Sequence, residues 1–85
     1  GAVVLGTASD GKVSLIAMAS RDLVAEGVHA GQIVREAAQI VEGGGGGQPH
    51  MARAGGRNPA RLDEALAKAR DVVLAQLAAA RSRQN

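Results

Sequence analysis

Five consecutive glycines, Gly43–Gly47, restrict the fold of this 85-residue chain more than any other feature. They open a fourteen-residue stretch, Gly43–Gly56, that holds seven of the twelve glycines. Glycine reaches positive φ without steric cost and lets other groups approach the backbone, but it loses the most entropy on ordering. The stretch therefore predicts either a site where main-chain N–H groups face a ligand, a phosphate or another backbone, or a flexible connection that binds nothing.

The composition limits the ways in which such a chain can form a core or bind nucleic acid. It has no Phe, Tyr or Trp, and 46% of its residues are hydrophobic. The core must therefore be packed from Val, Leu, Ile, Met and Ala. The composition therefore excludes the class of single-strand binding proteins that stack bases on Phe, Tyr or Trp rings. A nucleic-acid role would rest on phosphate contacts and shape.

The charge is only slightly basic overall, but its distribution is informative. Ten Lys and Arg stand against eight Asp and Glu, and eight of the ten cations are Arg. Arginine binds phosphate through a planar fork of donors, whereas lysine acts as a point charge. Between residues 41 and 60, Arg53 and Arg57 oppose a single acid, Glu42, so the glycine stretch is locally cationic.

Other features bear on cellular context and on domain boundaries. The absence of cysteine excludes disulfides and thiolate metal sites. With no signal peptide and no apolar run near eighteen residues, we expect no membrane span and a cytoplasmic protein. The chain opens directly on an apolar run without a Met, so we expect it to be part of a larger domain.

The first third of the chain predicts a β-hairpin over residues 2–20. Asp10-Gly11 separates two apolar runs, and this dipeptide suits the positive φ values of a type I′ turn. In the second run Leu15 and its alternate neighbours form a wholly apolar face, and the opposite face, with Ile16 and Met18, is mostly apolar. We therefore expect this strand to be covered on both sides.

Two helices are predicted from apolar residues at three- and four-residue spacing. The first covers residues 30–42, with Arg35 on its polar face and Gly43 as the C-capping glycine. Its buried stripe comprises Ala30, Ile33, Val34, Ala37, Ala38 and Val41. The second covers about residues 59–81 and starts at Asn58-Pro59, a good N-cap followed by a favoured first residue. Its buried stripe comprises Leu62, Ala65, Leu66, Ala69, Val73 and Leu77.

Between the helices we expect a glycine-rich loop over 43–50 and a short strand over 51–55 that pairs with the hairpin. This order predicts an α/β (α+β) fold in which two helices pack on one small sheet. Residues 1–85 form one domain in this interpretation. Three strands would leave a sheet edge or face incomplete, which again favours a piece of a larger domain.

The chain offers few candidates for catalysis. Its two histidines are His29, which we expect to cap or flank the first helix, and His50, inside the glycine loop and the better functional candidate. Two distant histidines and scattered acids do not provide the three or four ligands of a metal site. No nucleophile has a motif around it, and no Gly-Lys-Ser/Thr follows the glycines. We therefore expect neither a catalytic residue nor a metal.

Three segments together resemble the C-terminal domain of bacterial alanyl-tRNA synthetases, a DHH-associated type of domain. They are Val13–Ala17, Ala37–Val41 and, most specifically, Gly43–Gly56. The resemblance covers nearly the whole chain. Three positions depart from the family pattern, because the family usually has a basic residue at Gln48, an acidic one at His50 and often Gln at Arg53.

The resemblance implies a non-catalytic accessory module of a larger enzyme. That parent enzyme ligates alanine to its tRNA with ATP, and its catalytic site and zinc-containing editing site lie in upstream domains. The module itself would need no cofactor. It would contact the elbow of alanine tRNA and help to couple aminoacylation with editing, and in some relatives it also contributes to self-association.

The residues and the resemblance together predict RNA contacts in and beside the glycine stretch, because a structured elbow is read by shape and backbone. The predicted contacts are Gly44, Gly45, Gly46, Gly47, His50, Arg53 and Arg57. In one alternative the glycines only let the loop cross the sheet, and Arg53 pairs with Glu42.

Three further alternatives concern the whole chain. It could be an oligomerisation or protein-interaction module that uses an apolar sheet face, or part of a free-standing editing protein. It could also be the nucleotide-phosphate-binding domain of a DHH phosphoesterase. Such domains usually place His directly after Gly-Gly, whereas Gln48 and Pro49 intervene here.

Overall fold

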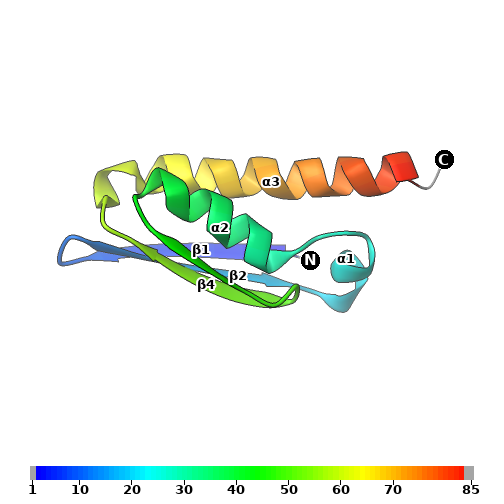
Figure 1. Ribbon diagram of the computed structural model, residues 1–85, viewed down its shortest axis with the longest axis horizontal. Helices are drawn as coiled ribbons and strands as arrows, with labels where there is room; N and C mark the ends of the chain where they lie inside the picture. The colour runs from blue at the N-terminus through cyan, green and yellow to red at the C-terminus, as the bar shows by residue number, and fades with distance from the viewer. Residues whose placement is uncertain (1, 84–85) are drawn as a thin grey trace.

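The computed structural model describes residues 2–83, with side chains as far as Arg81. Its elements are β1 (Ala2–Ser9), β2 (Lys12–Ala19), α1 (Arg21–Ala25), α2 (Ala30–Ile40), β3 (Gly44–Gly47), β4 (Met51–Gly56), the 3-10 helix η1 (Pro59–Arg61) and α3 (Leu62–Arg83). The strands form one antiparallel sheet in the order β1-β2-β4-β3. Helices α2 and α3 cover one face of it, so the predicted α+β fold is confirmed (Figure 1).

The predicted hairpin is confirmed as β1 and β2. Asp10 and Gly11 have φ values of 52° and 74°, both in the left-handed region that a type I′ turn requires. Ser9 pairs with Lys12 directly across this turn. The connection that follows β2 contains the short helix α1, which the sequence pattern did not predict.

The expected glycine loop is wrong over its first half. Gly44–Gly47 form the edge strand β3, which pairs with β4 from Gly44 opposite Gly55 to Gly47 opposite Ala52. Only the residues between β3 and β4 form a turn, closed by the Gln48 N–H donating to the Met51 carbonyl oxygen at 2.9 Å. The short strand that was expected to pair with the hairpin is confirmed as β4, which pairs with β2. The sheet therefore has four strands.

The ends of the helices differ in detail from the expected boundaries. Helix α2 ends at Ile40, and the residue with positive φ after it is Glu42 (57°) rather than Gly43. The Gly43 N–H donates to the Ala38 carbonyl oxygen at 2.9 Å. At the second helix, the Asn58 side chain makes no capping bond, and one 3-10 turn precedes α3.

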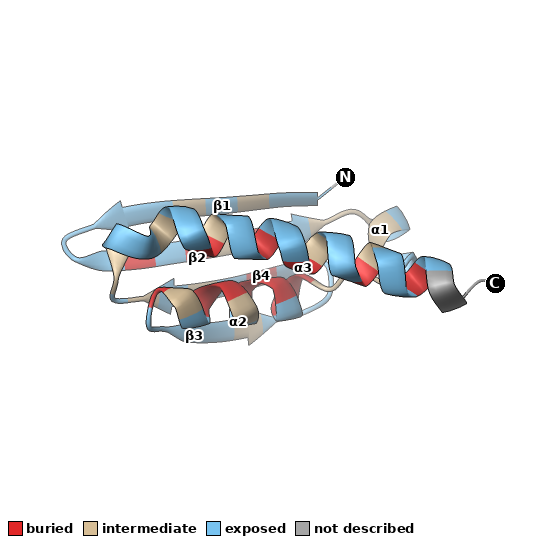
Figure 2. Ribbon diagram, turned by 90° about the horizontal axis from the view of Figure 1, so that it is seen from above, coloured by how far each residue is buried: buried red, intermediate tan, exposed pale blue. Residues whose placement is uncertain are grey.

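The core lies between the helices and one face of the sheet, where Leu15 is fully buried (Figure 2). Every residue of the predicted α2 stripe is buried. On α3 the stripe is shifted, because its predicted leucines flank a line of buried residues that are mostly small. That line comprises Ala65, Ala69, Val72, Gln76 and Ala80. Small side chains there let α3 approach α2 closely.

The opposite face of the sheet is open, so the expectation that β2 is covered on both sides is wrong. Val3 and Leu5 of β1 are 48% and 54% exposed, and Met18 and Met51 beside them are 43% and 38% exposed. Both long helices lie on the other face (Figure 1). Among residues 2–83, no helix is both long and apolar enough to cross a membrane.

Candidate nucleic-acid interface

Strand β3 forms a free edge of the sheet (Figure 2). In an antiparallel pair, alternate residues exchange hydrogen bonds with the partner strand, and the others turn their N–H and C=O groups away from it. Half of the peptide groups of an edge strand therefore face outward. Because β3 consists only of glycine, no side chain of its own covers these groups.

Alternate glycines of the run are required by close contact with β4. A Cβ atom at Gly45 would lie 2.5 Å from the Cα of Ala54, and one at Gly47 would lie 2.8 Å from the Cα of Ala52. A Cβ at Gly43 would strike the carbonyl oxygen of Gly55. These contacts leave no space for a side chain, so Gly43, Gly45 and Gly47 are needed for β3 to pair with β4.

Gly44 and Gly46 have no such role in the fold. Nothing lies within 4 Å of a Cβ built at Gly44, and the nearest atom to one at Gly46 is Nη2 of Arg35, at 3.9 Å. Neither residue has a positive φ. Successive Cβ positions in a strand point to opposite faces of the sheet, so those at Gly44 and Gly46 lie on the other side of β3 from the positions that meet β4. Glycine in a strand lowers stability by about 0.5–1 kcal/mol relative to alanine. The described contacts do not explain why glycine stands at these two positions.

The predicted arginines lie beside this edge without a carboxylate partner. Arg53 is opposite Gly46 in β4 and exposed, whereas Ala52 next to it is buried under the helices. Arg57 is also exposed, and its N–H donates to the Val41 carbonyl oxygen at 2.7 Å. Within the described part of the chain neither arginine forms an ion pair, so the suggested pairing of Arg53 with Glu42 is absent.

Arg61 lies just beyond this group and differs from it. Its guanidinium contacts the Glu64 carboxylate at 2.7 Å. The hydrogen bond and the negative charge of Glu64 raise the pKa of Arg61 above its ordinary value. Arg61 is therefore engaged by Glu64 in the first turn of α3, whereas Arg53 and Arg57 are free to bind an external anion.

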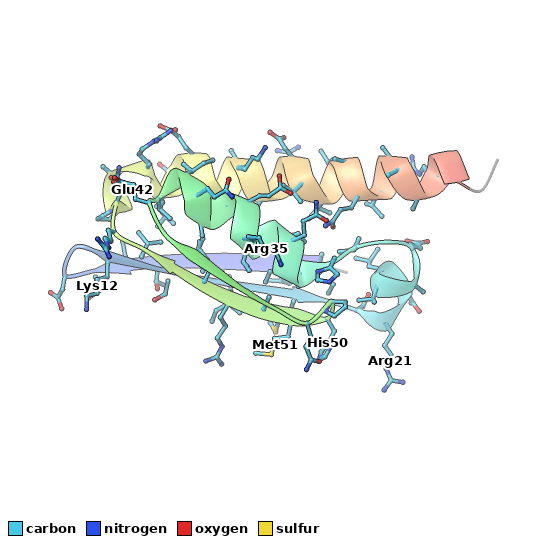
Figure 3. All side chains as sticks on the ribbon, in the orientation of Figure 1. Lys12, Arg21, Arg35, Glu42, His50 and Met51 are labelled. Carbon is cyan, nitrogen blue, oxygen red and sulfur yellow. The ribbon has the colours of Figure 1, made fainter. Side chains whose placement is uncertain are left out.

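His50 lies in the turn between β3 and β4 (Figure 3), whereas Arg57 follows the far end of β4. Its carbonyl oxygen accepts a hydrogen bond from the Ala19 N–H at 2.9 Å, which ties the turn to β2. Arg57 is seven positions after His50 along an extended segment, or about 24 Å away. A shallow groove of about 460 Å³ adjoins the turn and includes His50 and Arg53. The predicted residues thus form a line along one edge, and Arg57 lies beyond the groove.

Arg35 is a candidate contact that the sequence pattern did not identify. It lies on the polar face of α2, as expected, and its guanidinium reaches the free edge beside Gly46 (Figure 3). The helical pattern shows only that Arg35 is exposed. Its position beside Gly46 depends on β3 lying along α2, which no local sequence signal predicts.

His29 and Gln76 have structural roles. The Nδ1 of His29 accepts a hydrogen bond from the Gln32 N–H at 3.2 Å, which confirms the expected cap of α2. Gln76 accepts from the His29 N–H at 3.1 Å and donates to the His29 carbonyl oxygen at 3.3 Å. This contact joins the middle of α3 to the start of α2. Over the described residues, no three His, Asp or Glu side chains form a group that could hold a metal ion.

Comparison with known proteins identifies relatives along nearly the whole chain. The alanine–tRNA ligase of Acetivibrio thermocellus is 56% identical over 78 residues, 92% of this chain and 9% of that protein. The ligase of Desulforudis audaxviator is 63% identical over 72 residues, 85% of this chain and 8% of that protein. This chain therefore spans less than a tenth of the ligases that it matches.

A solved structure and a family model agree with these relatives. The C-Ala domain of Aquifex aeolicus alanyl-tRNA synthetase has the same fold, with a TM-score of 0.74 and 24% identity over 89% of this chain and 65% of that one. The model of the DHHA1 domain matches residues 1–75. Because this match covers most of the sequence, the chain belongs to the DHHA1 domain family.

Proposed function

We propose that this chain is the C-terminal tRNA-binding module of an alanyl-tRNA synthetase and that it binds the elbow of alanine tRNA along the β3 edge. The relatives that support this proposal are named alanine–tRNA ligases. In the proposal, ligation and editing take place in other parts of a longer polypeptide. This module holds the tRNA and couples the two activities.

The observation that carries the proposal is the bare backbone edge at Gly44 and Gly46. The fold has space for a side chain at both positions, yet both are glycine. Arg53 and Arg57, which have no carboxylate partner among the described residues, lie beside that edge. A bare edge flanked by free guanidinium groups suits the close approach of a phosphate backbone.

The same features set the mode of binding. With no Phe, Tyr or Trp, the module lacks the large aromatic platforms of single-strand binding proteins, which favours binding to the shape and phosphates of a structured RNA. Its net charge is only +2, so binding is expected to be weak and to fall steeply with salt. Discrimination between tRNAs is then left to the rest of the synthetase.

The test is a titration of the chain with alanine tRNA and with a minihelix that lacks the elbow, at low and physiological salt. Binding to the whole tRNA and not to the minihelix is the expected result. Equal weak binding to both, lost at physiological salt, would show generic electrostatic attraction and overturn the proposal. Absence of binding to either RNA would also overturn it.

Removal of the free arginines should weaken this binding. We expect Arg53→Ala and Arg57→Ala each to raise the Kd for alanine tRNA about five- to tenfold and to reduce the slope of log K against log salt by about one. Filter binding at several salt concentrations measures both. Arg70→Ala is the matched control, because Arg70 is exposed on α3 next to β1, at the opposite edge of the sheet. An equal effect of all three variants would contradict the assignment.

Side chains at the bare positions should block the edge without harming the fold. We expect Gly44→Ala and Gly46→Ala to weaken tRNA binding about threefold or more, since a methyl group keeps a phosphate from the backbone. Their thermal stability should stay equal to wild type or rise slightly. Unchanged affinity in both variants would show that these glycines are not RNA contacts.

The open sheet face supports a second candidate function, self-association. Val3, Leu5, Met18 and Met51 are exposed on neighbouring strands, and this face has no helix over it. Sedimentation over a hundredfold range of concentration tests this function without RNA. A single species at the mass of the monomer throughout would reject it.

A further inference from the structure

We propose that Arg35 is an additional RNA contact and that Arg35 and Arg53 hold one stretch of phosphate backbone between them, with Gly46 at the centre. The inference rests on the proposed function, since it concerns the same edge. It adds a residue from the helical layer to a site that was predicted only from the glycine stretch, with its Arg53, and from Arg57 directly after it. The site would then have one arginine on each face of the sheet.

The geometry places one guanidinium on each side of Gly46. Nη2 of Arg35 is 3.9 Å from the Cβ position of Gly46, which belongs to the edge strand β3. Arg53 is paired with Gly46 in the sheet, and the residues before and after it in β4 turn toward the helices. The Arg53 side chain therefore leaves the sheet on the open face. In the proposal, an anion at the edge beside Gly46 is bound by both side chains.

The charge of Arg35 is not used elsewhere in the described structure. It has no ion pair or hydrogen bond among the described side chains. The positions three and four residues away on α2 are Gly31, Gln32, Ala38 and Gln39, so no acid can form a helical pair with it. The adjacent Glu36 is already bonded to Gln32 at 3.0 Å and contacts Lys68 at 3.9 Å.

Arginine at both positions suits a phosphodiester better than lysine would. A guanidinium presents five N–H donors in a rigid plane, and two of them can bind two oxygens of one phosphate. Arginines on two faces of one strand would hold the RNA backbone against the edge from both sides. Bare glycine between them is then required, because a side chain at residue 46 would stand where the phosphate lies.

The experiment measures the affinity of the chain for alanine tRNA as a function of salt. The variants are Arg35→Ala, Arg35→Lys, Arg53→Ala and the Arg35→Ala/Arg53→Ala double variant. Arg70→Ala again serves as the control that removes the same charge elsewhere. Arg35 is exposed, so its variants should keep the wild-type circular dichroism spectrum and midpoint of unfolding.

We expect Arg35→Ala to raise the Kd about five- to tenfold and to lower the salt slope by about one. Arg35→Lys should restore the slope but only part of the affinity, because lysine supplies charge without the planar fork. The double variant should lose less than the product of the two single losses if both side chains hold the same phosphates. A role of Arg35 in stability alone would not change the salt slope.

The possible failures can be told apart. Suppose that the wild type binds tRNA through the elbow but that Arg35→Ala weakens this binding no more than Arg70→Ala does. This result would overturn the inference and leave the proposed function intact. If the loss of affinity in the double variant equalled the product of the two single losses, the two arginines would act independently, and the shared site would be overturned. Absence of wild-type binding to alanine tRNA would overturn both proposals.

Discussion

Gly45→Ala is expected to lower the free energy of unfolding by about 2–3 kcal/mol, because it forces a side chain into a space that β4 already fills. The new Cβ would lie 2.5 Å from the Cα of Ala54 and 2.6 Å from its Cβ. Both atoms belong to a paired strand, so relief requires β3 to move away from β4. Urea unfolding followed by far-UV circular dichroism measures the loss, since the chain has no Trp or Tyr.

The matched control is the neighbouring Gly44→Ala. The same chemical change there meets open space, and we expect the free energy of unfolding to stay constant or rise by less than about 1 kcal/mol. The contrast between adjacent glycines is the important result. Equal stabilities of the two variants would show that β3 does not lie against β4 as described.

Gln76→Ala should have an effect of similar size for a different reason. The Gln76 side chain satisfies both the N–H and the carbonyl oxygen of His29, and it is only 8% exposed. Truncation leaves the His29 N–H without a partner and opens a void between α2 and α3, whereas the His29 carbonyl oxygen keeps the bond from the Ile33 N–H at 3.2 Å. We expect a loss of about 2–3 kcal/mol in the free energy of unfolding, measured by urea or thermal unfolding.

Gln32→Ala provides the comparison for Gln76. Gln32 accepts one hydrogen bond from Gln76 at 3.1 Å, but it is exposed and water can replace it. Its loss should cost less than about 1 kcal/mol. If the two variants were equally stable, the contact between Gln76 and His29 would contribute little, and packing alone would hold α3 on α2.

Local chemistry explains which parts of the fold could be predicted. The β1–β2 turn follows from Asp10 and Gly11, whose preferred φ values are a property of those two residues. The buried stripe of α2 follows from a period of three and four in its own sequence. In both cases the residues that determine the structure are the residues that adopt it.

The remainder depends on residues far apart in the chain. Glycine has low strand propensity and no alternation of side chains, so β3 carries no local signal and exists because of β4. Gln76 is buried because it meets the peptide groups of His29, 47 residues away. The same distinction holds in the candidate site, since Arg53 lies within the glycine stretch in sequence and Arg35 is close to it only in space.

A strand made only of glycine also has an unusual mechanical property. Other strands are locked in place along their length, because a shift would exchange one set of side-chain contacts for another. No such exchange opposes the sliding of β3. It is held chiefly from its ends, by the fit of Gly43 beside Gly55 and by the hydrogen bond between Gln48 and Met51. Changes to the length of that turn should therefore shift the whole edge along β4.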